Sequence, residues 1–313
     1  MRFTWISDFE PYISKSLIPK AGYVVERNIS KNGRSDVVLA RSKLTNHAIC
    51  LKTIRIPDGK AGKAVQNELT VAFGLSDFHT PHPRLVCVYE WFWDSCSVPS
   101  VVIVMEYCDL SLEHFLSRVR YLRNSVVSLS AVVVLFTDIL GALCFLEFER
   151  ILHQDLKPSN ILWKRENVWK LSDFGSMRRL SHQSDRPGIF EGTLSTSSPE
   201  SLMGRSCSKS DIWSFGCVIW EVVTLIRPFR IVDLTSFQNS GKLCRDFPID
   251  LYFKNQHQSI GRKRLKSLIR KHLLIPESNS RPTASEIHQT DLINILIPPH
   301  GHNTYGMFPS DAL

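Results

Sequence analysis

One run in the middle of the chain, HQDLKPSNIL, combines side chains that a phosphoryl transfer would use. It supplies a carboxylate at Asp155, a cation at Lys157 and an amide oxygen at Asn160 on one short loop. Moving a phosphoryl group requires cations for its spread negative charge, a carboxylate for the attacking hydroxyl, and oxygen ligands for magnesium. The spacing therefore predicts a loop able to support this chemistry.

Two further places supply the remaining charges. In the run LSDFG, Asp173 precedes a Phe-Gly pair. A hard carboxylate at this position could hold magnesium against phosphates. The loop of Asp173 can face the loop of Asp155 across a hairpin. Upstream, Lys52 ends the run AICLK, and Glu68 lies in a helix-like segment. An ion pair between these two would direct the lysine toward the phosphates.

Each of these residues has an ordinary structural alternative. An aspartate in a loop, such as Asp155 or Asp173, is usually a turn former or a helix cap, and Asn160 alone would be a turn residue. A lone lysine in a strand, such as Lys52, is more often a solvated edge residue. Only their joint occurrence favours the chemical interpretation.

Two kinds of pattern must position these residues. From about 23 to 105, strand-like runs rich in β-branched and aromatic residues surround one helix-like segment at about 62–75. From Leu112 onward the apolar spacing is helical, with the strand-sized pieces NILW and VWKLSD in between. We therefore predict a small antiparallel sheet with one helix, then a helical lobe, with a hinge near 105–109 and a cleft between the lobes.

Length and hydropathy set the class of protein. The 313 residues suffice for one bilobal domain or two compact ones, and 43% hydrophobic with 22% charged residues is ordinary for a globular protein. The apolar stretch from Leu129 to Phe148 approaches membrane-spanning length, but Asp138 and Glu147 interrupt it, and carboxylates inside a membrane are costly. We predict a buried helix there.

Charge and cysteine usage argue against several other classes. The net charge of +8 is spread along the chain, and the densest basic run, 261–271, has apolar residues at helical spacing, which favours a solvated helix face over a nucleic-acid or localisation patch. The eight cysteines contain no CxxC pair, so buried thiols in a reducing compartment fit better than zinc or disulfides. With no secretory signal pattern at the start, we expect a cytoplasmic protein, with a nuclear location also compatible, that binds neither nucleic acid nor membrane.

Taken in order, the motifs resemble those of the eukaryotic protein kinase family over roughly 23–296. ICLK is similar to the family's strand lysine motif, HQDLKPSN to its catalytic loop and DFG to its metal motif. GTLSTSSPE resembles the end of its activation segment, SDIWSFG its helix anchor and PESNSRPTASEI its closing arginine motif. Any one of these would be a weak signal, whereas six in the family's order seldom coincide by chance.

The resemblance implies an α+β, bilobal kinase-like fold. Its divisions would be an N-terminal extension (1–22), a sheet lobe (23–107), a mainly helical lobe (108–296) and a C-terminal tail (297–313). The segment 230–262 matches no part of the family's pattern, and the sequence gives no oligomeric state.

The resemblance also implies a reaction and its catalytic residues. The chain would move the γ-phosphoryl group of ATP, with Mg²⁺, onto serine or threonine hydroxyls of protein substrates. Asp155 would be the base or hydroxyl-orienting group, and Lys157 would neutralise the transferring group. Asn160 and Asp173 would ligate magnesium. Lys157 favours Ser/Thr specificity, because tyrosine-specific members lack a lysine there, and Thr193 agrees with it.

The remaining implied positions bind the nucleotide or support the fold. Lys52, held by Glu68, would grip the α and β phosphates. The other nucleotide positions would be a phosphate-covering turn (Ile29, Ser30, Asn32, Gly33, Ser35), an adenine sandwich (Val37, Cys50, Leu162), a gatekeeper (Met105) and a hinge (Glu106 to Cys108). Structural roles would fall to the Glu200–Arg281 ion pair and to His153, Trp213 and Phe215 as core residues.

The phosphate-covering turn departs from the family. Ser30, Asn32 and Ser35 replace the three loop glycines, and Gly33 is out of register. Small residues still permit a turn, because asparagine tolerates left-handed backbone angles, but ATP affinity would be weakened. This departure motivates an alternative interpretation, a pseudokinase that acts as a nucleotide-binding or scaffolding module.

A second departure from the family concerns regulation by phosphorylation. Gln154 stands where many members carry an arginine that clamps an activation-segment phosphate, although Arg178 and Arg179 could partly substitute. We therefore hypothesise that activity does not depend strongly on phosphorylation of the segment's hydroxyls: Ser181, Ser184, Thr193 and Ser195. Ser198 and Thr196 also replace common family residues, which could alter peptide docking. A third interpretation, a small-molecule phosphotransferase, would not need the SPE, SDIWSFG and Arg281 motifs.

Overall fold

The protein is described by a computed structural model over residues 22–31, 35–56, 65, 68–69, 82–94, 98–122, 126–180, 190, 192–228 and 265–290. These residues belong to two compact units, whose boundary in the chain lies between Asp109 and Leu110. The predictions for 1–21, 230–262 and 297–313 lie outside the described residues, as do those for Asn32, Gly33 and the hydroxyls of Ser181 and Ser184.

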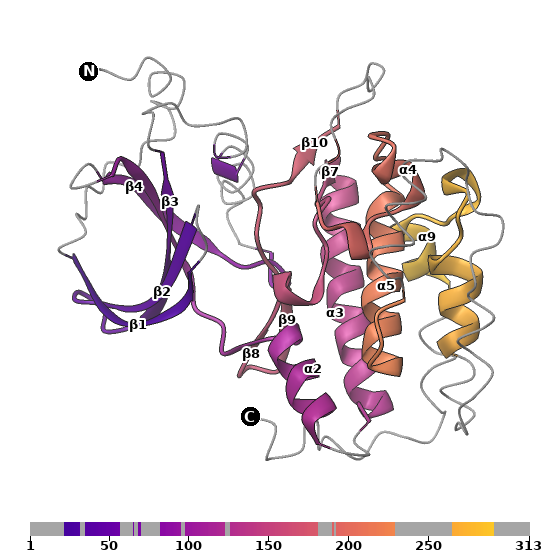
Figure 1. Ribbon diagram of the computed structural model, residues 1–313, viewed down its shortest axis with the longest axis horizontal. Coiled ribbons are helices and arrows are strands. Elements are labelled where there is room, and N and C mark those ends of the chain that lie inside the picture. The colour runs from indigo at the N-terminus through magenta and orange to yellow at the C-terminus, as the bar shows by residue number, and fades with distance from the viewer. Residues whose placement is uncertain are drawn as a thin grey trace. The chain divides into compact units, whose positions relative to one another are not determined.

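The first unit is built on a five-stranded antiparallel sheet in the order β1-β2-β3-β5-β4 (Figure 1). Its strands are β1 (Tyr23–Lys31), β2 (Ser35–Ser42), β3 (Ala48–Arg55), β4 (Val88–Asp94) and β5 (Ser100–Glu106). They follow the β-branched and aromatic runs of the sequence, whose side chains pack well on a pleated surface. Of the predicted helix at about 62–75, Val65, Glu68 and Leu69 are described, and all three are helical.

Alternation along the central strand β3 separates a core face from the face that carries Cys50 and Lys52. Ile49 and Leu51 are buried in a cluster with Ala40, Val102 and Val104. Because successive side chains of a strand point to opposite faces, Cys50 and Lys52 lie on the other side of the sheet. The period-two pattern thus places the predicted phosphate-gripping lysine.

The second unit is mainly helical, with two small sheets ordered β6-β8-β9 and β10-β7. Its elements are β6 (Leu110–Ser111), α2 (Leu112–Tyr121), α3 (Leu129–Phe148), β7 (Ile151–Leu152), η3 (Pro158–Asn160), β8 (Ile161–Lys164), β9 (Val168–Leu171), β10 (Arg178–Arg179), η4 (Leu194–Thr196), α4 (Pro199–Leu202), α5 (Ser210–Thr224), η5 (Ile269–Leu273), η6 (Ser278–Ser280) and α9 (Ala284–Gln289). The serines before α2 and α3 are N-caps: Ser111 accepts from the His114 amide and Ser128 from the Ala131 amide.

Helix α3 is long and apolar enough to cross a membrane, the one such helix in the described part of the chain. Over half of its apolar window is nevertheless buried inside the second unit. Its carboxylate at Asp138 is buried and accepts a hydrogen bond of 2.9 Å from the Trp169 amide. A helix that is apolar all round and packed in this way is the predicted core helix.

Helix α5 lies beside α3 and forms the centre of the second unit (Figure 1). Every residue from Ser210 to Val223 is buried, including the predicted core residues Trp213 and Phe215. A Cβ atom on Gly216 would lie 2.8 Å from the side chain of Leu273, so the glycine allows η5 to pack closely against α5.

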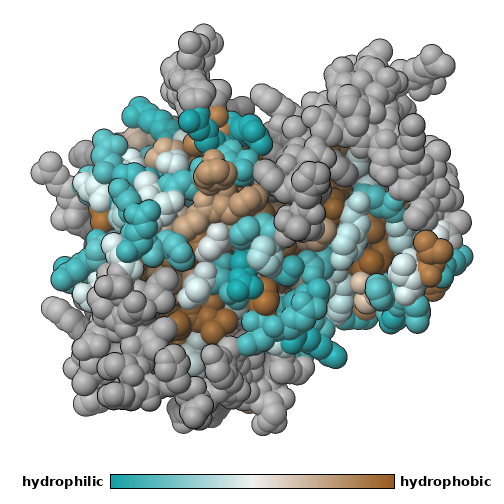
Figure 2. All heavy atoms as spheres, turned by 180° about the vertical axis from the view of Figure 1, so that it is seen from behind, coloured by the Kyte–Doolittle hydropathy of each residue, from teal (hydrophilic) through white to brown (hydrophobic). Residues whose placement is uncertain are grey.

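The predicted α+β architecture is confirmed: a strand-rich first unit is followed by a mainly helical second unit. On the face seen in Figure 2, hydrophilic and hydrophobic side chains are interspersed over the described surface. Most large apolar side chains of the described residues are nevertheless buried, with exceptions such as Leu44 and Tyr121 on the surface.

Candidate active site

Asp155 is the centre of a compact polar network in the loop between β7 and η3. Its side chain is largely buried, with the residue only 8% exposed. Its Oδ2 atom accepts from Lys157 Nζ at 2.6 Å and from Asn160 Nδ2 at 3.1 Å, and its Oδ1 accepts from the Thr193 hydroxyl at 2.6 Å. One carboxylate thus gathers a cation, an amide and a hydroxyl, and the structure brings together three residues that the sequence grouped.

The backbone before Asp155 is held from behind by Asp211 at the start of α5. The two carboxylate oxygens of Asp211 accept the backbone N–H groups of His153 at 2.7 Å and Gln154 at 2.9 Å. Burial raises the pKa of Asp211, opposed by His153 and by these two hydrogen bonds. Gln154 itself has a left-handed backbone, with φ 66°, so the loop turns sharply at this anchor.

His153 is a structural residue, as predicted. It is fully buried, and its Nε2 atom lies 3.0 Å from the Ser172 carbonyl oxygen. The Asp155 amide donates to His153 Nδ1 at 3.3 Å. The imidazole therefore joins the loop of Asp155 to the strand end that precedes Asp173.

The hairpin of β8 and β9 brings the two predicted loops to the same end. Ile161 pairs with Leu171, so the residues just outside the hairpin, Asn160 and Ser172, face each other. The amide and the hydroxyl of Ser172 both donate to the Asn160 carbonyl oxygen at 2.9 Å. Asp173 follows immediately, in a left-handed conformation with φ 66°.

In the first unit, Lys52 on β3 pairs with Glu68. Their charged atoms lie 2.6 Å apart, and both side chains are mostly shielded from solvent. The ion pair that the sequence predicted is therefore present in the first unit. Glu68 comes from the predicted helix, so the sheet and the helix each supply one partner.

The predicted adenine and gatekeeper residues of the first unit lie on β2, β3 and β5. Val37 is paired with Lys52, and Cys50 with Met105, across adjacent strands. Burial raises the pKa of the Cys50 thiol to about 11. Cys87 and Glu106 exchange hydrogen bonds, including one from the Cys87 amide to a Glu106 side-chain oxygen, which fixes the start of the predicted hinge.

The other predicted nucleotide residues divide between the units. Ile29 and Ser30 lie near the end of β1, where the register shifts between Asn28 and Ser30, and Ser35 begins β2. Leu162 is in the second unit, on β8, paired with Lys170. Cys108 follows β5 in the first unit.

The predicted pair of Glu200 and Arg281 is present and fastens α4 to the segment before α9. Arg281 is fully buried, with its Nη1 atom 2.7 Å from Glu200 Oε1 and its guanidinium 5.2 Å from the centroid of the Trp213 ring. Burial alone would raise the pKa of Glu200, but Arg281 and a hydrogen bond from Ser210 outweigh it and hold that pKa below its usual value.

Three features of the site were missed by sequence reasoning. Thr193 was considered for specificity and phosphorylation, not as a direct partner of Asp155. Asp211 was recognised only inside a helix motif, and nothing in its spacing indicated that its carboxylate accepts two backbone amides of a distant loop. Gly192 carried no predicted role, yet with φ 118° it passes so close to Gln154 that a Cβ atom would lie 2.5 Å from the carbonyl oxygen.

A family model described as the protein kinase domain matches residues 23–293. The chain belongs to the protein kinase family. The predicted resemblance is thereby confirmed, and with it the membership in a family of ATP-binding transferases.

Several characterised kinases are similar to this kinase chain. Mitogen-activated protein kinase kinase 2 of Arabidopsis thaliana is 31% identical over 229 residues, which cover 70% of this chain and 60% of that protein. Serine/threonine-protein kinase Nek5 of Mus musculus is 31% identical, over 72% of this chain and 34% of that protein. Sperm motility kinase 2B of Mus musculus is 29% identical over 92% of this chain and 54% of that protein. The kinase chain thus spans at most about three fifths of the length of these relatives.

Proposed function

We propose that this kinase chain transfers the γ-phosphoryl group of ATP to serine or threonine hydroxyls of protein substrates. The observation that carries the proposal is the network at Asp155, which joins Lys157, Asn160 and Thr193 through one carboxylate. A network of this composition offers both a proton acceptor and a cation for the transferring group.

The proton acceptor in this proposal is Asp155. An incoming hydroxyl would replace Thr193 as donor to Oδ1, and Asp155 would orient it and accept its proton. Lys157 Nζ, now 2.6 Å from Oδ2, would turn toward the transferring phosphoryl group and neutralise part of its negative charge. The backbone held by Asp211 keeps the carboxylate in place for this step.

Magnesium fits the oxygen donors of the second unit. Both N–H groups of the Asn160 side chain are directed at Asp155, to its carbonyl at 2.8 Å and to Oδ2 at 3.1 Å. This orientation leaves the amide Oδ1 as the ligand atom, alongside the carboxylate of Asp173. When bound, the ion would neutralise phosphate charge, and hard oxygen ligands of this kind suit it.

The relatives support a protein substrate and Ser/Thr specificity, because those named above include a serine/threonine-protein kinase. We also propose a reducing compartment, the cytoplasm or the nucleus. The six described cysteines are free thiols, which suits such a location.

The test is magnesium-dependent transfer of labelled γ-phosphate to a generic protein substrate. The wild-type chain and Asp155→Asn are compared after both are shown to be folded. We expect incorporation from the wild type and a loss of about a hundredfold or more from the variant, the usual contribution of a positioned acid–base group. Equal incorporation of labelled phosphate by the wild type and by Asp155→Asn would contradict the proposal.

A noncatalytic nucleotide-binding scaffold is the second candidate, favoured by the serines at 30 and 35 in place of turn glycines. Thermal unfolding with ATP, in the presence and absence of Mg²⁺, separates the two functions. A scaffold would be stabilised by the nucleotide and yet show no transfer above the Asp155→Asn background.

A further inference from the structure

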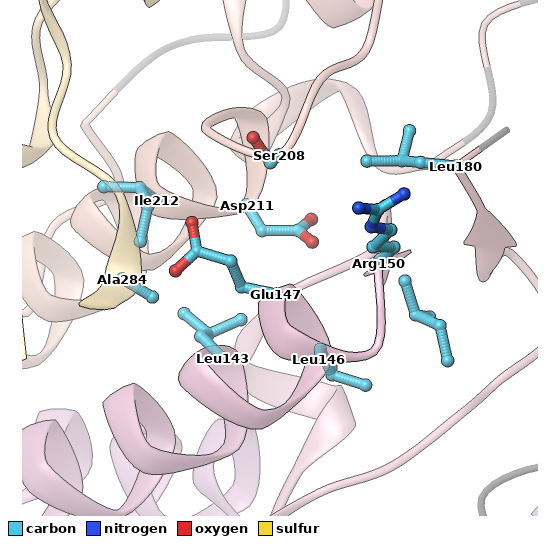
Figure 3. Close-up of a pocket in the computed structure, with 10 residues that line it drawn as sticks. Leu143, Leu146, Glu147, Arg150, Leu180, Ser208, Asp211, Ile212 and Ala284 are labelled. Atoms are coloured by element: carbon cyan, nitrogen blue, oxygen red, sulfur yellow. The ribbon is translucent and has the colours of Figure 1, made fainter. Parts of the chain in front are cut away.

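A cavity of about 240 Å³ lies within the second unit, and Figure 3 shows the residues that line it. Its walls come from the C-terminal end of α3, from β7, from Leu180 and from the beginnings of α5 and α9. Asp155, Lys157 and Asn160 do not line it. The cavity is therefore separate from the proposed catalytic network.

Most of the cavity wall is aliphatic. The apolar lining residues are Leu143, Leu146, Ile151, Leu180, Ile212 and Ala284. A small set of polar side chains completes it: Glu147, Arg150, Ser208 and Asp211. An apolar wall with a few polar groups is typical of small-molecule sites, and a volume just below the usual 300 Å³ or so calls for a ligand of only a few heavy atoms.

The hydrogen bonds of the described residues show which polar atoms of the wall are available. Both oxygens of Asp211 are occupied by the loop amides described above. On Glu147, Oε2 accepts from the amide of Ser285 at 2.9 Å and from its hydroxyl at 2.7 Å. Among the described residues, Glu147 Oε1 and the Ser208 hydroxyl have no such partner, so a carboxylate oxygen and a hydroxyl remain for a ligand.

The charges of the wall favour a cation at Glu147. Figure 3 shows the Arg150 side chain beside Leu180, whereas the Glu147 carboxylate is turned toward Ala284 at the other side of the cavity. A positive group on Glu147 is thus separated from the guanidinium. The wall also carries two carboxylates against one arginine.

We propose that this cavity binds a small aliphatic amine as its ammonium ion. The ammonium group donates to Glu147 Oε1, with the Ser208 hydroxyl as a further acceptor. The alkyl chain lies against Leu143 and the other aliphatic side chains of the wall. Simple alkylamines are protonated at neutral pH, as lysine side chains are.

The location gives such a ligand a connection to the catalytic loop. Asp211 lines the cavity, and its carboxylate accepts hydrogen bonds from the amides of His153 and Gln154. A bound amine would restrain this aspartate, so the two amides would exchange their hydrogens more slowly. This effect concerns binding alone and does not require phosphoryl transfer.

The test uses n-pentylamine, titrated into the full chain carrying labelled isoleucine methyl groups. We expect the resonances of Ile151 and Ile212 to shift while that of Ile161, on β8 and outside the cavity, stays in place. A ligand of so few atoms should bind weakly, and we expect a Kd of about 1 mM, which stays well within the ceiling on affinity for its size. From n-propylamine to n-pentylamine, each added methylene should tighten binding about fourfold.

Neutral and anionic analogues test whether the ligand must carry a positive charge. Variants at Glu147 and at the neighbouring Glu149 test whether Glu147 binds it. n-Pentanol and n-pentanoate should bind at least about tenfold more weakly, as should n-pentylamine to Glu147→Gln. Glu149→Gln, a carboxylate outside the cavity at the same helix end, should bind like the wild type. If Glu147→Gln fails to fold, Ser208→Ala should weaken binding severalfold.

Three results would overturn the proposal. One is an unshifted Ile151 and Ile212 at an amine concentration about twenty times the expected Kd. Another is binding of n-pentanol as tight as that of n-pentylamine, which would show that the cavity selects for apolar ligands alone. The third is tighter binding of n-pentanoate, which would assign the cavity to Arg150 and to anions.

Discussion

Replacing Gly192 with alanine should disable the proposed active site with little effect on the cores. Gly192 has φ 118°, a conformation that costs an alanine about 1–3 kcal/mol. Its new Cβ would lie 2.5 Å from the Gln154 carbonyl oxygen, an overlap with rigid backbone worth about another 1–3 kcal/mol. The sum is at least about 2 kcal/mol, and it acts on the contact between the Gly192–Thr193 segment and the loop that carries Gln154 and Asp155.

Because Thr193 follows Gly192 and bonds to Asp155, the strain would be relieved by moving that hydroxyl away. A cost of about 2 kcal/mol corresponds to about a thirtyfold loss of rate. The assay compares kcat for Gly192→Ala with that of Gly141→Ala, in the middle of α3, where a Cβ would meet no atom within 4 Å. The control should keep its activity and gain about 0.5–1 kcal/mol of stability. A Gly192→Ala variant with more than half of the wild-type kcat would refute the reasoning.

Three further outcomes follow from named contacts. Gly216→Ala should destabilise the chain by about 1–3 kcal/mol in urea unfolding, because its Cβ meets Leu273 at 2.8 Å, and an unchanged midpoint would contradict that packing. Ser195→Ala should retain most of its turnover, because Gln154 offers no charge for a segment phosphate, and a hundredfold loss in a folded protein would show otherwise. The lowered pKa of Glu200 means that its ionised form stabilises the fold fully above about pH 4.5 and progressively less as the pH falls through the lower folded-state pKa. Urea unfolding of wild type and Arg281→Met should therefore differ by about 3–5 kcal/mol at pH 7 and by less in acid, whereas a constant difference would argue against the pair.

Local patterns were enough to predict strands β2 to β5, β8 and β9, and the placement of single residues on them. The β-branched runs gave β2, β3 and β5, and alternation along β3 separates Lys52 from the core residues Ile49 and Leu51. The apolar stretch of α3 was correctly interpreted as a core helix, because carboxylates such as Asp138 within it are costly inside a membrane. These features depend on neighbours close in the chain.

Contacts between distant segments could not be derived from periodicity. Thr193 reaches Asp155 across 38 residues, and Glu200 reaches Arg281 across 81. The second pair was predicted only through the family resemblance, and the first was not predicted at all. The left-handed turn at Gln154 could not be predicted from the sequence either, since glutamine shows no preference for that conformation. The turn lies where Asp211 binds the Gln154 amide and Gly192 approaches the Gln154 carbonyl oxygen.

The central claim is that Asp155 performs acid–base chemistry on a protein hydroxyl. The most direct measurement is single-turnover transfer of labelled γ-phosphate by wild type and Asp155→Asn at saturating Mg²⁺ and ATP, with the labelled residue identified by hydrolysis. We predict label on serine or threonine and a rate about a hundredfold to ten-thousandfold lower for the variant, with ATP binding unchanged. A variant rate within about twofold of the wild type, or label absent from both proteins, would contradict the claim.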